Sequence, residues 1–258
     1  MSSIKVIKIG GNVIGNPEKL EKFLDDFATL PSPKVLIHGG GKEATELAKK
    51  LGVEVKMHQG RRITNKPMLD VAVMVYGGLI NKQLCASLQK RGVNALGLSG
   101  ADADCVRAVK RESKEIDWGY VGDVIPGGVD GSFIQNLLEN GITPVFCALT
   151  HDGNGNLLNT NADTMATEIA SSLSAGNIVD LVFCFEKKGV LLNSSDEDSV
   201  IEKITPEYFE KLKESEIVSE GMIPKIENAI KALEGGVSKV LIKSAENLLN
   251  TIQTTVEK

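Results

Sequence analysis

The sequence contains few of the residues that metal clusters, disulfide frameworks and histidine-based catalysis require. It has only four cysteines and three histidines in 258 residues. The cysteines lie far apart and form no C-x-x-C pair, which indicates neither a zinc site nor a disulfide framework. The histidines stand in no recognisable Ser-His-Asp or Cys-His arrangement. These scarcities direct attention to chemistry that depends on glycines and charged side chains.

The sequence also lacks the features of membrane and nucleic-acid-binding proteins. We find no run of about 18 apolar residues suited to crossing a bilayer. Lys5 and Lys8 interrupt the first apolar run, unlike a signal peptide. A net charge of −5 argues against a nucleic-acid surface. With 42% hydrophobic and 24% charged residues, the composition is typical of a globular protein, and we expect a cytoplasmic one.

Two short apolar strands are each predicted to end in glycines. Residues 4–9 lead into a glycine pair, and residues 34–37 lead through His38 into three glycines. One predicted helix separates them, so the strands are expected to be parallel neighbours with both loops at one sheet edge. Glycine loops that precede helices aim backbone N–H groups at anions. The glycines are Gly10, Gly11, Gly39, Gly40 and Gly41.

The triglycine fits three known motifs incompletely. Gly39-x-Gly41-x-x-Ala44 matches a loose dinucleotide fingerprint, but no acidic residue follows about 20 positions later to bind a ribose. His-Gly-Gly-Gly resembles the oxyanion loop of esterases, but the chain has no G-x-S-x-G elbow. A Walker loop would need glycine where Leu36 stands. Each of these interpretations lacks a required residue.

The rest of the chain alternates between strand and helix patterns, which predicts an α/β protein with a mostly parallel sheet. A long helix is predicted over residues 66–91, with Gly77-Gly78 near its middle. Hairpins are predicted within 105–129 and around the turn at 152–155. Further strands are predicted at 178–185 and 239–242, and a helix is predicted to end the chain.

Phosphoryl transfer is the chemistry that these features favour. Lys8 adjoins the first glycine loop, Arg62 and Lys225 add cations, and Asp163 lies at a predicted strand-to-helix turn. Transfer of a phosphoryl group needs charge neutralisation and positioning more than covalent chemistry. Lysines and backbone N–H groups supply both, so the residues predict a kinase without naming its substrate.

Six ordered motifs resemble the amino acid kinase family, and most closely its acetylglutamate kinases. The resemblance extends from residue 4 to about residue 245. The motifs are Lys8-Ile9-Gly10-Gly11, His38-Gly39-Gly40-Gly41, Gly60-x-Arg62-x-Thr64, Gly119-Tyr120-Val121-Gly122, Asn159-x-Asn161-Ala162-Asp163 and Gly221-Met222-Ile223-Pro224-Lys225. The resemblance implies an open, mostly parallel eight-stranded sheet sandwiched between helices, a three-layer αβα fold. It implies one domain over 1–258, with an acylglutamate lobe at 1–158 and a nucleotide lobe at 159–258.

The resemblance also implies roles for individual residues. Lys8 and Lys225 would stabilise the charge on the transferring phosphoryl group, and Asp163 would orient them. Gly40, Gly41, Arg62 and Asn159 would bind the acylated glutamate, with Arg62 suited to a carboxylate because guanidinium pairs with it bidentately. The nucleotide and its phosphates would contact Gly10, Gly11, Glu186, Lys187, Lys188, Gly189, Ile217, Val218 and Ser219. Glu186 stands where the family usually has an aspartate.

The implied reaction is ATP-dependent phosphorylation of the side-chain carboxylate of N-acetyl-L-glutamate, the second step of arginine biosynthesis. Mg²⁺ would be carried by the nucleotide. N-succinyl-L-glutamate is an alternative acceptor, for which Arg61 could supply a cation, and an amino-acid-binding regulator with weak activity is a further alternative. Only Met1–Ser3 precede the first strand, whereas arginine-inhibited relatives carry an extra N-terminal helix. We expect a homodimer formed through the helix at 66–91 and not inhibited by arginine.

Overall fold

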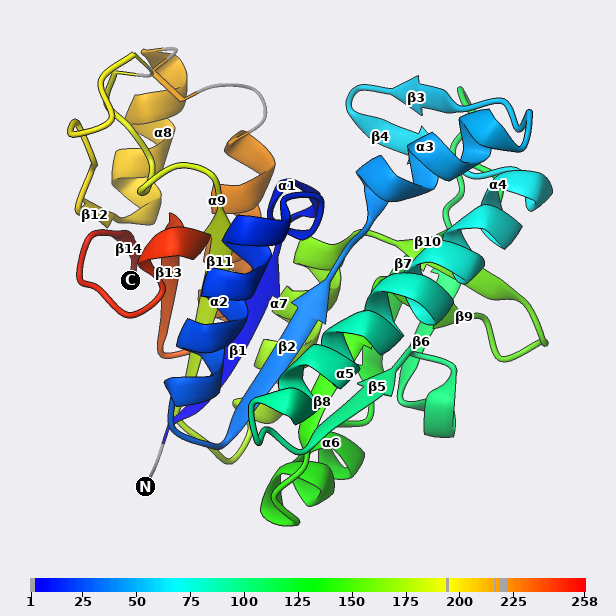
Figure 1. Cartoon of the computed structure of the whole chain (residues 1–258). Coiled ribbons are helices and arrows are strands. Elements are labelled where there is room, and N and C mark those ends of the chain that lie inside the picture. The colour runs from blue at the N-terminus through cyan, green and yellow to red at the C-terminus, as the bar shows by residue number, and fades with distance from the viewer. Residues whose placement is uncertain (1–2, 194, 216, 219–221) are drawn as a thin grey trace.

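The computed structural model describes residues 3–258 except 194, 216 and 219–221. Its centre is an eight-stranded sheet in which β1 lies between β2 and β11 (Figure 1). All neighbouring strands are parallel except β13 and β14. In spatial order the strands are β12 (Lys203–Ile204), β14 (Thr254–Val256), β13 (Lys239–Ser244), β11 (Val179–Phe185), β1 (Ile4–Ile9), β2 (Lys34–His38), β8 (Thr143–Cys147) and β5 (Ala95–Leu98). This confirms the predicted αβα fold.

Helices cover both faces of the sheet. In Figure 1, α2 and α5 lie in front of it, whereas α7 lies behind and packs on β1 and β11. The helices are α1 (Gly11–Ile14), α2 (Pro17–Thr29), α3 (Gly41–Lys50), α4 (Lys66–Ala72), α5 (Asn81–Lys90), α6 (Gly131–Glu139), α7 (Ala162–Leu173), α8 (Pro206–Glu214) and α9 (Ile223–Glu234). Short 3₁₀ turns, η2 (Asp102–Asp104) and η3 (Ala245–Asn247), connect other elements.

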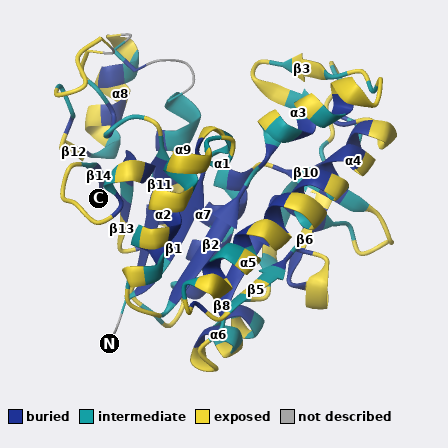
Figure 2. Ribbon diagram, viewed as in Figure 1, coloured by how far each residue is buried: buried dark blue, intermediate teal, exposed yellow. Residues whose placement is uncertain are grey.

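The central strands are apolar because both of their faces are covered. Val6, Ile7 and Ile9 of β1 are fully buried, as are Leu36 and Ile37 of β2. Figure 2 shows these strands as the buried centre of the molecule. Continuous β-branched and leucine-rich runs are expected in parallel strands that helices cover on both sides. The strands therefore hold their carboxyl ends, where both glycine loops begin, in a fixed register.

Four strands form a small closed barrel beside the main sheet. Strands β6 (Val106–Lys110) and β7 (Val121–Val129) form an antiparallel pair, as do β9 (Leu149–His151) and β10 (Leu157–Thr160). These pairs confirm the predicted hairpins. A third hairpin, β3 (Lys56–His58) and β4 (Arg61–Ile63), was not predicted; Gln59 and Gly60 at its turn have φ values of 46° and 73°.

The helix predicted at 66–91 is continuous but not uniform. Between α4 and α5 the segment η1 (Val73–Ile80) is π-helical and contains Gly77 and Gly78. By length and composition Lys66–Lys90 could cross a membrane, contrary to the expectation that no such stretch exists, but half of its most apolar window is buried inside the protein. A core helix of a globular protein also has this character.

The expected C-terminal helix is wrong. After β13 the chain makes only the short turn η3 and then returns as β14, antiparallel to β13. Lys243 explains part of this path, because its buried ammonium donates hydrogen bonds to the carbonyls of Leu248 (3.1 Å) and Asn250 (2.7 Å). These bonds satisfy carbonyls that would otherwise need the next turn of a helix.

Candidate active site

Three charged side chains that are far apart in the sequence meet at the carboxyl end of β1. Lys8 Nζ lies 2.7 Å from Asp163 Oδ1, and Lys225 Nζ lies 3.7 Å from Asp163 Oδ2. Lys8 comes from β1, Asp163 from the first turn of α7 and Lys225 from the first turn of α9. The structure therefore brings together the three residues expected to act in catalysis.

Asp163 remains ionised between the two lysines. Its burial acts to raise its pKa, but the charges of Lys8 and then Lys225 outweigh burial and hold the pKa below its usual value. Asn161 caps α7 by accepting hydrogen bonds from the N–H groups of Asp163 and Thr164, which fixes the carboxylate's position. Two ammonium groups and one carboxylate leave this cluster with one net positive charge, which suits an anionic ligand.

Both glycine loops lie next to the lysine cluster. Ile9 pairs with His38 in parallel register, so the loops after β1 and β2 leave the sheet at the same edge. Gly10 and Gly40 are the N-cap residues of α1 and α3, respectively. Glycine fits position 40, because a Cβ there would lie 2.5 Å from Ile80 Cδ1 and 2.8 Å from Tyr76 Cδ1. Both glycine loops, and the helix N-terminus that follows each of them, therefore lie at one edge of the sheet.

A cavity of about 520 Å³ opens beside this cluster and contains the residues expected to bind acylglutamate. Gly40, Gly41, Arg62 and Asn159 line it together with Asp163 and Lys225. Arg62 Nη2 donates to the carbonyl of Gly41 and to Thr45 Oγ1, each at 2.7 Å. Asn159 Nδ2 donates to Thr64 Oγ1 at 3.0 Å, which ties two of the sequence motifs together.

None of the described residues expected to bind nucleotide lines this cavity. Lys188 Nζ lies 2.6 Å from Asp198, and Lys187 Nζ lies 3.7 Å from Glu197, so both are paired with acidic side chains. Gly189 has a packing role, because a Cβ there would collide with Thr254 and Val200 at 2.7 Å. Glu186 directly follows β11, the neighbour of β1. Ile217 and Val218 lie between α8 and α9, and Ser219 is outside the described residues.

Sequence reasoning missed some of the cavity wall. Arg111 lines the cavity although it follows β6, and no local motif marked it. Its Nε lies 3.0 Å from Asp123 Oδ2, and its guanidinium lies 5.3 Å from the centre of the Trp118 ring. Tyr76 lines the cavity from η1. Both residues come from elements whose relation to the glycine loops depends on the tertiary fold.

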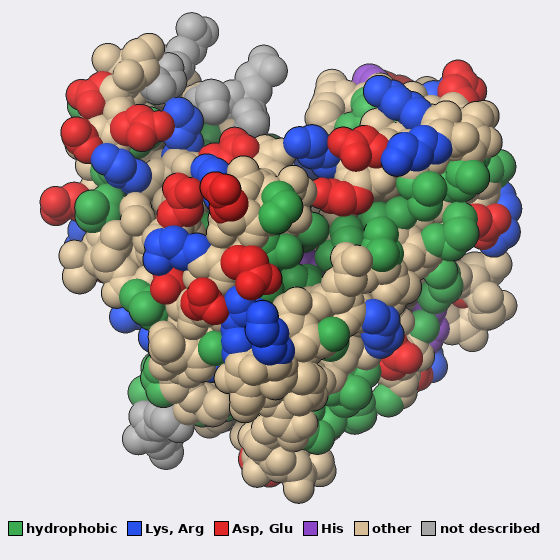
Figure 3. Space-filling model, viewed as in Figure 1, with side chains coloured by type: hydrophobic (Ala, Val, Ile, Leu, Met, Phe, Trp, Pro, Cys, Tyr) green, Lys and Arg blue, Asp and Glu red, His purple; other side chains and the backbone are tan. Residues whose placement is uncertain are grey.

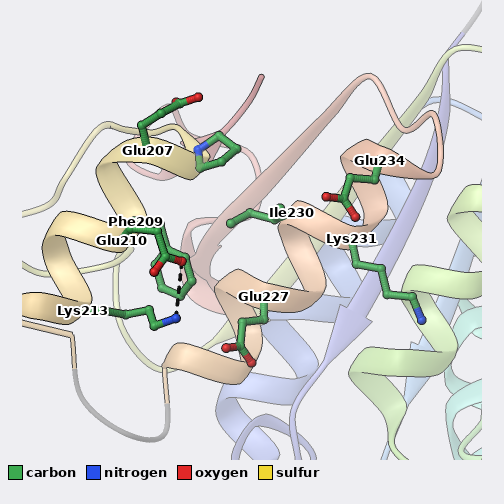
Figure 4. Close-up of a pocket in the computed structure, with 9 residues that line it drawn as sticks. Glu207, Phe209, Glu210, Lys213, Glu227, Ile230, Lys231 and Glu234 are labelled. Carbon is green, nitrogen blue, oxygen red and sulfur yellow. Dashed lines mark hydrogen bonds and ion pairs between the residues drawn. The ribbon is translucent and has the colours of Figure 1, made fainter.

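A second cavity, of about 420 Å³, lies between α8 and α9 (Figure 4). Phe209 and Ile230 form its apolar part, and acidic side chains surround them. Its lysines already have partners: Lys213 pairs with Glu210 at 3.3 Å and Lys231 with Glu168 at 2.6 Å. It shares no lining residue with the cavity beside Lys225, so we place the chemistry at the latter.

The fold and this site define a class of phosphotransferase, and comparison with known proteins agrees. The model of the amino acid kinase family matches residues 3–244. The chain belongs to the amino acid kinase family.

Its similarity to acetylglutamate kinases extends over nearly the whole chain. It is 51% identical to the acetylglutamate kinase of Cytophaga hutchinsonii over 253 residues, which cover 98% of this chain and 95% of that protein. It is 50% identical to the acetylglutamate kinase of Bacteroides thetaiotaomicron, covering 99% and 98% of the two chains. Among solved structures, the protein smu.665 of Streptococcus mutans matches with a TM-score of 0.80 and 32% identity, covering 99% of each chain.

Proposed function

We propose that this protein transfers the γ-phosphoryl group of ATP to the side-chain carboxylate of N-acetyl-L-glutamate. The product is N-acetyl-L-glutamyl 5-phosphate, and the reaction is the second step of arginine biosynthesis. The observation that carries the proposal is the Lys8–Asp163–Lys225 cluster, which lies beside both glycine loops and an arginine-lined cavity. The full-length similarity to acetylglutamate kinases supports the same acceptor. We infer that the enzyme is cytoplasmic.

The chemistry needs no general base. A carboxylate is already ionised near neutral pH and can attack phosphorus directly. Lys8 and Lys225 stabilise the negative charge that develops on the phosphoryl oxygens, while Asp163 holds both ammonium groups in place. The N–H groups of Gly10 and Gly11 hold phosphate oxygens in this scheme. Gly40 and Gly41 bind the acylated glutamate that accepts the phosphoryl group.

ATP is proposed to bind over the C-terminal half, near the residues after β11 and the segment before α9. Mg²⁺ is proposed to arrive coordinated by the nucleotide's phosphates, as in other phosphoryl transfers. Within the described part of the chain, no three His, Cys, Asp or Glu side chains are grouped closely enough to hold a metal ion.

An acceptor panel tests the proposal. ADP release is measured with N-acetyl-L-glutamate, N-succinyl-L-glutamate, free glutamate and aspartate at equal concentrations. We expect N-acetyl-L-glutamate to give the highest kcat/KM and the free amino acids to give almost no turnover. Turnover of free glutamate or aspartate above that of the acylated compounds would reject the proposed acceptor. Binding of the acylated compound without any ADP release would instead indicate the amino-acid-binding regulator.

N-succinyl-L-glutamate is a second candidate because the cavity contains more cations than one α-carboxylate requires. Arg61 and Arg111 line it in addition to Arg62. The terminal carboxylate of a succinyl group needs a cation, and exposed Arg61 is available in the described structure, whereas Arg111 already pairs with Asp123. A higher kcat/KM for the succinyl compound in the same panel would establish this alternative.

Arg62 is proposed to bind the α-carboxylate of the acceptor. Arg62 Nη2 donates to the Gly41 carbonyl and Thr45 Oγ1, and Nη1 makes only a long contact of 3.7 Å with Met68 Sδ, so Nη1 and Nε can turn to a ligand carboxylate. We expect Arg62→Ala to raise KM for the acylglutamate by about 10- to 100-fold, the equivalent of one charge-assisted interaction of roughly 1.5–3 kcal/mol. KM for ATP should change little, and Arg62→Lys should restore little, because lysine lacks the planar fork. Equal increases in both KM values would contradict this role.

The exposed side of the helix formed by α4, η1 and α5 is proposed to join two copies in a homodimer. Met74 and Leu79 in η1 are 49% and 52% exposed, and Figure 3 shows hydrophobic side chains along this region. A two-fold interface would pair this stripe with itself. We expect Leu79→Glu to shift sedimentation from dimer to monomer, whereas Leu51→Glu, at an equally exposed leucine beyond α3, should not. A wild-type monomer, or a dimer that persists in Leu79→Glu, would reject this interface.

A further inference from the structure

No catalytic role was predicted for His38, which forms a buried connection between the sheet and the triglycine. Its side chain is fully buried at the end of β2. His38 Nδ1 lies 2.7 Å from the carbonyl oxygen of Gly39, and Nε2 lies 3.1 Å from Asn81 Nδ2. Asn81 Nδ2 also donates to the carbonyl of Val145 in β8 at 2.9 Å. A continuous path of hydrogen bonds therefore runs from β8 through Asn81 and His38 to Gly39.

The hydrogen-bond partners of Asn81 and His38 determine which nitrogen of the His38 ring carries the proton. A carbonyl can only accept, so the amide NH₂ of Asn81 must face Val145, and the same NH₂ donates to His38 Nε2. His38 Nδ1 must therefore carry the proton that the Gly39 carbonyl accepts. Burial lowers the pKa of His38 to about 4, against a smaller opposing effect of the Gly39 hydrogen bond, which keeps the ring neutral near pH 7. Neutral His38 with its proton on Nδ1 is thus the expected form.

This hydrogen bond determines the direction of a backbone donor in the proposed site. The carbonyl of Gly39 and the N–H of Gly40 belong to one planar trans peptide, so they point in opposite directions. Holding the carbonyl toward His38 turns the Gly40 N–H away from His38. Gly39 and Gly40 both line the cavity beside Lys225. Without the His38 bond, a glycine peptide could rotate at small cost.

The Asn81 side chain fills a buried space that neighbouring residues leave open. It begins α5 directly after the π-helical segment, and it is 1% exposed. A side chain at Gly97 in β5 would collide with Asn81 Oδ1, so the strand leaves room for this amide. The preceding residue, Ile80, packs against Gly40 itself. π-helical turns often occur where a helix must present particular side chains to a functional site.

We propose that Asn81 and His38 are positioning residues that aim the Gly40 N–H at the substrate oxygens in the cavity. Asn81 acts by holding His38 with its proton on Nδ1, and His38 acts by holding the Gly39 carbonyl. The proposal rests on the proposed phosphoryl transfer for its kinetic consequence. Its structural part, the position of the proton on His38, can be measured independently of turnover.

Two substitutions at Asn81 test the kinetic consequence. A carboxylate in Asn81→Asp cannot donate to Nε2 and instead accepts from it, so at a pH above the pKa of the ring in this variant the single ring proton moves from Nδ1 to Nε2. We expect kcat to fall by about 10²-fold, as when one aligned backbone donor is lost, with KM for the acceptor within a few-fold. Asn81→Leu removes the donor without reversing it, and we expect a smaller loss of about tenfold.

Cys85→Ala is the matched control for packing. Cys85 lies one turn after Asn81 and contacts the same strand, since a Cβ at Gly97 would lie 2.9 Å from its sulfur. It reaches neither His38 nor the triglycine through any hydrogen bond among the described residues. We expect kcat within about twofold of wild type. An equal loss of kcat in Cys85→Ala and Asn81→Leu would show that packing of α5, rather than the hydrogen bond, is responsible.

Nitrogen NMR of ¹⁵N-histidine-labelled protein measures the proton position. In a His58→Gln/His151→Gln background, His38 is the only histidine left in the sequence. We expect the Nδ1–H form with Asn81 present and the Nε2–H form in Asn81→Asp. An Nε2–H form in the unmodified Asn81 protein, or wild-type kcat in Asn81→Asp despite the moved proton, would overturn the proposal. If the protein turns over no acceptor at all, the proposed function fails while the NMR result still decides the proton position.

Discussion

Replacing Lys8 with alanine should lower kcat by about 10²–10⁴-fold while changing KM for both substrates much less. Lys8 lies in the central strand and is 9% exposed, so its ammonium is fixed by the fold and directed by Asp163 at 2.7 Å. An ammonium held in this way stabilises charge that appears mainly in the transition state, and its loss therefore affects kcat. Lys225→Ala should behave similarly, although Lys225 lies farther from Asp163, at 3.7 Å.

Lys239→Ala provides a matched control for Lys8→Ala. Lys239 begins β13 and pairs with Asp180 at 3.8 Å, so it is also a sheet lysine with an aspartate partner. It lies at the opposite end of the strands from the glycine loops. We expect steady-state kinetics of Lys239→Ala to match wild type. Near-normal kcat in Lys8→Ala would remove Lys8 from the catalytic role.

Asp163→Asn should lower both activity and stability. The variant leaves Lys8 and Lys225 close together without the carboxylate that separates their charges. Breaking a buried ion pair by removing one partner costs about 3 kcal/mol, and we expect a loss of that order in the free energy of unfolding at pH 7. We also expect kcat to fall by about 10²-fold or more, because the ammonium groups lose their common anchor.

The contribution of Asp163 to the free energy of unfolding should depend on pH, in a direction that its pKa determines. The pKa of Asp163 is lower in the folded protein than its ordinary value of 3.8, because Lys8 and Lys225 outweigh burial. Its contribution is therefore complete above pH 3.8 and is lost as the pH falls through the lower folded-state pKa. Urea unfolding at pH 7 and in acid should show the gap between wild type and Asp163→Asn narrowing in acid. Asp180→Asn, at a buried aspartate that pairs with the sheet lysine Lys239, is the control, and equal kcat losses in both variants would contradict a specific role for Asp163.

Much of the site could be predicted from the sequence because its parts follow strand ends. Apolar runs identified β1 and β2, and parallel pairing then brings Gly10 and Gly40 to one edge. The meeting of Lys8, Asp163 and Lys225 came from the family resemblance rather than from any spacing in the chain. Arg111 could not be found in this way, since its place in the cavity depends on how β6 and β7 pack beside the main sheet.

Two other features depended on tertiary contacts that the sequence does not display. The C-terminal segment was expected to be helical, but pairing with β13 and the hydrogen bonds of Lys243 favour a turn and a strand. Tertiary contacts often override local propensity in this manner. The role of His38 was also hidden, because its partner Asn81 is 43 residues away and is reached only across the sheet edge.

Trapping the product with hydroxylamine tests the central claim most directly, namely that Lys8, Asp163 and Lys225 transfer phosphate to a carboxylate. Purified protein is incubated with MgATP, N-acetyl-L-glutamate and hydroxylamine, and ADP and hydroxamate are both measured. An acyl phosphate reacts with hydroxylamine, so we predict equal amounts of ADP and hydroxamate, and loss of both in Lys8→Ala. ADP release without hydroxamate, or hydroxamate formation undiminished in Lys8→Ala, would contradict the claim.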